Sequence, residues 1–134
     1  MPSPCMVVTM TPRAFRALVL ALPEVVEGEH RGHADFRVGG KVFATLGWPD
    51  ASYAMLKLPP ARQAICLRAY PAVFEAASGA WGRSGCTRLL LRHAKGKWLR
   101  PLLIHAWRQH APTTLRHAFD ADPTVVVPRE EPSP

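Results

Sequence analysis

The sequence predicts an α+β fold: an antiparallel sheet of about four to five strands, with helices packed on one face. Three observations support this class. Apolar residues recur at helical spacing near the N-terminus and again beyond residue 98, whereas apolar and polar residues alternate in the middle of the chain. At 134 residues, the chain is long enough to bury a core without disulfides or a structural metal.

The first predicted helix begins after Thr11. A hydroxyl residue followed by Pro12 is a typical helix start, because proline lacks only an N–H that the first helical position does not use. Pro23 ends the helix. The stripe that would face the sheet has members at i, i+3, i+4 and i+7, namely Phe15, Leu18, Val19 and Leu22.

The sheet is predicted to begin with a hairpin of residues 34–38 and 41–46. Gly39-Gly40 between them supplies the positive φ angles of a two-residue turn. This turn sets the register that we expect, in which Phe36 lies opposite Phe43 and Val38 lies opposite Lys41. An aromatic cross-strand pair would then stabilise one face of the hairpin.

The next predicted elements are a third strand at 52–58 and a helix at 61–69, which follows Pro59-Pro60. A short helical turn is expected after Pro71, and then a glycine-broken loop at 79–85 that carries Trp81.

A strand at 87–93 would place Arg88 and Arg92 on the same face. Lys95-Gly96-Lys97 then turns the chain into a helix at 98–110, with Pro101 in its first turn, and a last helical turn covers 114–119.

Domain boundaries follow from composition. Residues 1–10 form a short flexible leader, residues 11–119 form a single domain, and residues 120–134 form a proline-rich acidic tail. The three cysteines, Cys5, Cys66 and Cys86, are scattered and odd in number, which disfavours a disulfide framework and a zinc site. With no apolar run long enough to span a membrane, we expect a cytoplasmic protein without a cofactor.

Several segments resemble the MmcQ/YjbR family, in family order. They are residues 21–25 with Glu27, 36–44, 55–57, 70–74, Ala106-Trp107 and Ala111-Pro112. The resemblance implies a small bacterial protein with a double-wing, frataxin-like (CyaY-like) fold, often labelled DNA-binding. Many members carry a tryptophan just before the strand that begins here at Thr87, where this chain has Gly85-Cys86. It instead resembles the branch with a Trp-Gly-Arg-x-Gly-x-Thr loop, and a ligand contact made by the other branch's tryptophan is not carried over.

The net charge of +7 is concentrated, because residues 76–119 hold eight Lys or Arg and no Asp or Glu. A segregated positive field attracts anionic partners. Trp81 lies in the same stretch and would stack on a base if exposed, and Lys41 is a further candidate contact. The main candidates for contacts to nucleic-acid phosphates are six bases within 18 residues, namely Arg83, Arg88, Arg92, Lys95, Lys97 and Arg100.

This pattern predicts weak, salt-sensitive binding of nucleic acid, with duplex DNA as the expected ligand, by a monomer or weak dimer. A solvated charged face is the plain alternative. A second functional interpretation is a non-enzymatic domain for a small anionic ligand or an acidic protein. A third is a cysteine-dependent enzyme, in which Arg83 and Arg88 would favour a Cys86 thiolate. No partner histidine is identifiable for that cysteine, so we do not expect an enzyme.

His30 and His33 are weak candidates for metal ligands, because carboxylates lie nearby at Glu27, Glu29 and Asp35. The two histidines are not at helical spacing, and the sequence fixes no third ligand. Structural roles are therefore the preferred interpretation, and no metal site is predicted.

Overall fold

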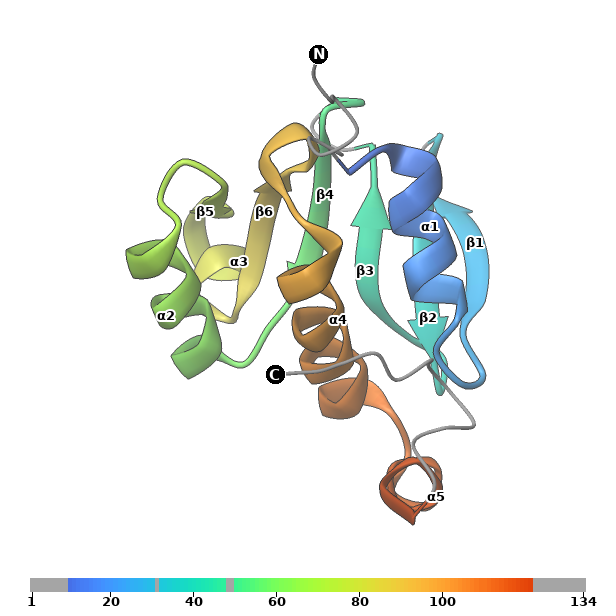
Figure 1. Cartoon of the computed structure of the whole chain (residues 1–134). Helices are drawn as coiled ribbons and strands as arrows, with labels where there is room; N and C mark the ends of the chain where they lie inside the picture. Colours follow the sequence, from blue (N-terminus) through green and yellow to red (C-terminus); the bar gives the residue numbers. More distant parts are fainter. Residues whose placement is uncertain (1–9, 31, 48–49, 122–134) are drawn as a thin grey trace.

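The computed structural model of the protein describes residues 10–30, 32–47 and 50–121 (Figure 1). The described strands form one antiparallel sheet in the order β1-β2-β3-β4-β6-β5, with α1 and α4 on the same face (Figure 1). The strands are β1 (Val26–His30), β2 (His33–Val38), β3 (Lys41–Leu46), β4 (Tyr53–Lys57), β5 (Phe74–Ala76) and β6 (Cys86–Leu90). The helices are α1 (Pro12–Leu20), α2 (Pro60–Ala69), α3 (Gly79–Arg83), α4 (Gly96–His110) and α5 (Thr113–Ala121).

The first helix forms as its sequence predicts. The Thr11 hydroxyl accepts a hydrogen bond from the amide of Ala14 at 3.0 Å, and Pro12 occupies the first turn. Phe15 and Val19 are completely buried, and the Phe15 ring meets the Phe36 ring edge-on at 6.4 Å between centroids. This contact fixes α1 against the sheet.

The hairpin differs from its predicted register at one point. Gly39 and Gly40 have positive φ, and Val38 pairs with Lys41 as predicted. Phe36, however, pairs with Ala44, because the register shifts and leaves Phe43 as an extra residue in β3. Both Phe43 and Ala44 are buried as a result. The predicted Phe36–Phe43 pair is therefore wrong, and Phe36 packs on Phe15 instead.

Two edge strands were not expected. β1 has the polar sequence Val-Glu-Gly-Glu-His, which lacks the apolar alternation of a strand, yet it pairs with β2 along its length. β5 occupies part of the segment for which a helical turn was predicted, and it pairs with β6. The sheet therefore has six strands rather than four or five among the described residues.

The last strand is shorter than predicted. β6 ends at Leu90, which pairs with the first residue of β4, Tyr53. The chain then enters a 3-10 turn, η2 (Leu91–His93), so Arg92 does not share a strand face with Arg88. Because α4 already begins at Gly96, Pro101 lies in its second turn rather than its first.

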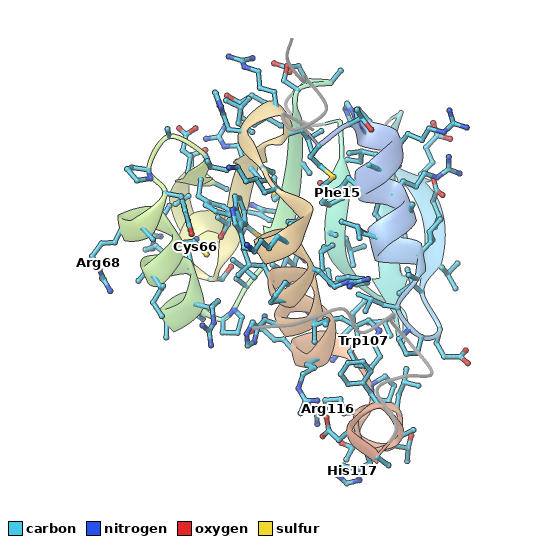
Figure 2. All side chains as sticks on the ribbon, in the orientation of Figure 1. Phe15, Cys66, Arg68, Trp107, Arg116 and His117 are labelled. Carbon is cyan, nitrogen blue, oxygen red and sulfur yellow. The ribbon has the colours of Figure 1, made fainter. Side chains whose placement is uncertain are left out.

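Trp107 links α4 to both ends of the domain. Its indole is buried and donates a hydrogen bond to the Pro23 carbonyl at 3.0 Å, and the Phe119 ring of α5 packs on it at 5.2 Å (Figure 2). Arg108 of α4 forms an ion pair with Asp120 of α5. The helix α5 extends to Ala121, beyond the predicted end of the domain. Most of the predicted leader and nearly all of the predicted tail lie outside the described residues.

Candidate nucleic-acid interface

Four arginines of the described residues have acidic partners. Arg16 pairs with Glu27 at 2.7 Å, Arg37 with Asp35 at 3.0 Å and Arg88 with Glu75 at 3.7 Å, while Arg108 pairs with Asp120. Their charges are compensated locally. The field that a ligand meets is thus set by the remaining basic side chains.

Arg88 occupies the middle of β6, opposite Glu75 of β5 and Met55 of β4. Its side chain is only 21% exposed, and its Nε is buried with no hydrogen-bond partner among the described residues. Arg88 therefore has little access to a ligand.

Three exposed bases gather where β6 leads into α4. Arg92 lies in the 3-10 turn, Lys95 is the residue before the first turn of α4, and Lys97 lies in that turn. None of them has an acidic partner among the described residues, and we call them the β6–α4 basic surface. Arg100 lies one turn further along α4 and is half-buried.

The first turn of α4 strengthens this field. It contains no acidic residue, and no side chain of the described residues caps its free amides. The N-terminal end of a helix carries a partial positive charge, so the helix and the three bases add with the same sign.

Trp81 and Arg83 lie at the other end of β6, on the single turn of α3. Trp81 is 66% exposed, and the Lys57 ammonium lies 5.9 Å from its ring centroid. Trp81 touches no other aromatic ring of the described part of the chain. We call Trp81 with Lys57 the Trp81 platform.

Close backbone contacts hold this turn in place. A Cβ on Gly82 would lie 1.8 Å from the Ala77 carbonyl oxygen, and a Cβ on Gly85 would lie 1.9 Å from that of Leu58. Gly85 also has a φ of +111°, which favours glycine. A side chain at either glycine of the Trp-Gly-Arg-x-Gly-x-Thr loop would collide with a backbone carbonyl, so both positions require glycine.

Buried hydrogen bonds complete the support. Gln63 of α2 directs its Nε2 to the Gly82 carbonyl at 3.0 Å, the Cys86 carbonyl at 3.2 Å and the Thr87 hydroxyl at 3.1 Å. The Thr87 hydroxyl in turn donates to the Gly85 carbonyl at 2.9 Å. The sequence did not single out Gln63, because an isolated glutamine in a helix resembles a surface residue.

Cys86 lies beneath this turn and is 2% exposed. Burial raises the pKa of its thiol, and the nearby Lys57 ammonium and a hydrogen bond from Ser84 offset this only in part. The expectation that Arg83 and Arg88 favour a Cys86 thiolate is therefore wrong.

Burial and nearby positive charges lower the pKa values of two histidines of α4. Burial lowers the pKa of His110, and the charges of Lys57 and Lys41 lower it further. Burial and the charges of Arg62 and Arg108 lower the pKa of His105 in the same way. The exposed Lys41 thus acts on His110 together with Lys57. Arg62, which the sequence did not indicate, adds to the field around His105.

The weak metal candidates His30 and His33 lie opposite each other in the β1–β2 pairing. His33 is half-buried on β2, and the His30 side chain lies outside the described residues. The nearby Asp35 accepts two hydrogen bonds from Arg37, at 3.1 and 3.0 Å. Within the described ranges, no three His, Cys, Asp or Glu side chains are close enough to hold a metal ion. No described helix combines the length and apolar character of a membrane span.

The six predicted bases therefore divide along β6. Arg83 lies beside Trp81 at the start of the strand, Arg88 is paired in its middle, and the β6–α4 basic surface follows its end, with Arg100 one turn further along α4. Five strand residues extend about 17 Å, so the two exposed groups are well separated. Figure 1 shows α3 and the connection to α4 at opposite ends of β6.

Comparisons with known proteins agree with this architecture. A crystal structure of protein DR2400 from Deinococcus radiodurans, whose family-model domain is DUF419, superimposes with a TM-score of 0.66. The match covers 84% of this chain and 89% of that chain at 17% identity, which shows the fold. No curated protein matches the sequence. A family model described as YjbR matches residues 20–109, more than half of the chain, and the protein therefore belongs to the YjbR family.

Proposed function

We propose that this domain binds nucleic acid, and DNA in particular, without sequence recognition, through the β6–α4 basic surface. One observation carries the proposal. Arg92, Lys95 and Lys97 are exposed and have no acidic partner among the described residues, whereas Arg88, Arg16, Arg37 and Arg108 each have one. Uncompensated bases at a positive helix end are suited to phosphate oxygens.

The chemistry of this surface favours backbone contacts over base reading. Lysine ammonium groups bind phosphate as mobile point charges, and such contacts position a protein on DNA without carrying sequence information. Binding of this kind has Kd values of about 10⁻⁴ to 10⁻⁶ M at physiological salt. We therefore expect weak binding that depends strongly on salt.

The proposed activity is binding without catalysis, in the cytoplasm, by a monomer or weak dimer. The raised pKa of Cys86 supports the first part, because a buried neutral thiol is a poor nucleophile. The described free cysteines, Cys66 and Cys86, are compatible with a reducing compartment.

Two variants with the same change in net charge test the surface. Lys95→Gln with Lys97→Gln removes two positive charges from the proposed contact, and Arg68→Glu lowers the net charge by the same two units on the outer side of α2 (Figure 2). Fluorescence anisotropy of a labelled duplex at several salt concentrations gives the slope of log K against log salt. We expect the double variant to lower the magnitude of the slope by about 1.8, because each phosphate contact contributes about 0.9. Arg68→Glu should leave the slope unchanged.

Two results would contradict the proposal. Equal slopes for the two variants would mean that the field acts through net charge alone and that this surface is not the contact. Absence of binding to any duplex or single strand at about 50 mM salt, where phosphate contacts are strong, would reject nucleic-acid binding altogether. A small anionic ligand or an acidic protein would then be the target of the same charges.

A further inference from the structure

We propose that the Trp81 platform stacks on an unpaired nucleobase, so that the protein binds single-stranded nucleic acid more tightly than duplex. This inference rests on the proposed function, but it concerns a different surface and a different part of the ligand. The β6–α4 basic surface accounts for phosphate contacts only. Trp81 offers a planar ring that phosphate contacts do not use.

The first argument is that the contacts of its turn hold Trp81 in an exposed position. Trp81 is 66% exposed, although close backbone contacts hold the turn that carries it. Gly82 and Gly85 allow backbones to touch, and Gln63 ties the turn to α2 with buried hydrogen bonds. A ring on such a support loses little conformational freedom when it binds, which favours affinity.

The second argument is the charge around the ring. Lys57 holds its ammonium 5.9 Å from the indole centroid, a distance at which the ring also attracts the cation. Arg83 is exposed on the same turn as Trp81 and adds a second positive charge. A base stacked on Trp81 would therefore have positive charge beside its own phosphates. Aromatic rings set in a positive groove are the usual elements of single-strand binding.

The third argument concerns the state of the ligand. A base inside a duplex is stacked on both faces, so an indole reaches it only if it leaves the helix, at a cost of a few kcal/mol. A base in a single strand has a free face and stacks irrespective of its identity. The platform consequently adds affinity for single strands and adds none for an intact duplex.

The decisive variant is Trp81→Ala, measured with a labelled oligothymidylate and with a labelled hairpin duplex at the same salt concentration. We expect the wild-type protein to bind the single strand at least about fivefold more tightly. Trp81→Ala should weaken single-strand binding by about 5- to 150-fold, the effect of losing one stacked base, and change duplex binding less than twofold. Trp81→Phe, which keeps a smaller ring, should recover part of the loss.

A positioning role for Lys57 has its own readout. Lys57→Met removes the charge but keeps a side chain of similar length. It should lower the magnitude of the salt slope for the single strand by about 0.7, the contribution of one phosphate, and leave the duplex slope unchanged. Arg68→Glu serves again as the distant charge control, and a thermal unfolding curve verifies that each variant is folded.

The outcomes separate this inference from the proposed function. If the wild-type protein binds the duplex but shows no preference for the single strand, the platform inference is wrong and the proposed function stands. Equal losses of single-strand and duplex affinity in Trp81→Ala, or no loss in either, would also overturn it. If neither probe binds to the wild-type protein, the proposed function fails first and the platform inference fails with it.

Discussion

The two ends of β6 differ in packing and in charge. At the Cys86 end, α3 is fixed by backbone contacts at Gly82 and Gly85 and by the buried amide of Gln63. At the Leu90 end, the chain makes a 3-10 turn and enters α4 with exposed bases, and no side chain in the described part of the chain caps the helix. Close backbone packing therefore characterises the Cys86 end, and exposed positive charge characterises the Leu90 end.

This difference determines what each end tolerates. A close backbone contact fails when a single methyl group is added, whereas a surface of mobile bases changes its field gradually with each substitution. We therefore expect changes at the close backbone contacts of the Cys86 end, Gly82 and Gly85, to appear as lost stability. Changes at the Leu90 end should appear as lost binding.

The largest effect is expected from Gly82→Ala. The added methyl group would lie 1.8 Å from the Ala77 carbonyl oxygen, so the turn must move and strain the hydrogen bonds to Gln63. We predict a loss of about 3 kcal/mol in the free energy of unfolding, measured by urea denaturation. Gly79→Ala in the same helix is the matched control. Its φ of +65° is strained for alanine but no atom lies within 4 Å of the new Cβ, so about 1 kcal/mol should be lost. Equal losses would show that the close contact does not define this end.

A smaller effect of opposite sign is expected from Lys97→Glu. An acidic residue in the first turn of α4 interacts favourably with the helix dipole, so the free energy of unfolding should rise by about 0.3–1 kcal/mol while DNA binding weakens. Arg68→Glu places the same charge in the last turn of α2 and should lower stability by a similar amount. A Lys97→Glu protein that loses stability together with binding would contradict the separation of the two ends.

The smallest effect concerns pH. The folded pKa of His110 lies below its ordinary value near 6.5, so the unfolded state takes up protons that the folded state does not as the pH falls below that value. Above about pH 6.5, His110 therefore does not reduce the free energy of unfolding. Below that pH, the free energy of unfolding falls until the lowered pKa is reached. Urea unfolding between about pH 8 and pH 5 should thus show decreasing stability, and less so in His110→Gln. His117→Gln, on exposed α5 (Figure 2), is the control, and an identical decline in all three proteins would exclude His110 as a source.

Much of the fold could be predicted because its signals are local. The Thr11 cap and the Gly39-Gly40 turn each specify a conformation within a few residues, and both formed as predicted. The Phe36–Phe43 pair failed because a bulge depends on how a strand bends to fit its neighbours. β1 and β5 were missed because an edge strand is defined by its partner rather than by its own sequence.

The candidate interface divides in the same way. Exposure of Lys95 and Lys97 follows from composition and from the start of a helix, which the sequence indicates. The pairing of Arg88 with Glu75 does not, because these residues meet only when β5 lies beside β6. The hydrogen bonds of Gln63 could not be predicted from the sequence either, because its three acceptors lie 19, 23 and 24 residues further along the chain.

By itself, the sequence determined the fold class, the first helix, the hairpin turn and an acid-free basic stretch, because propensity and charge belong to the residues themselves. Only the tertiary structure decided which of those bases are compensated and that Lys57 lies over Trp81. It also decided that Cys86 is buried and neutral. The physical reason is that ion pairs, burial and pKa values depend on distances between segments remote in sequence, and these distances are set by strand pairing and close packing.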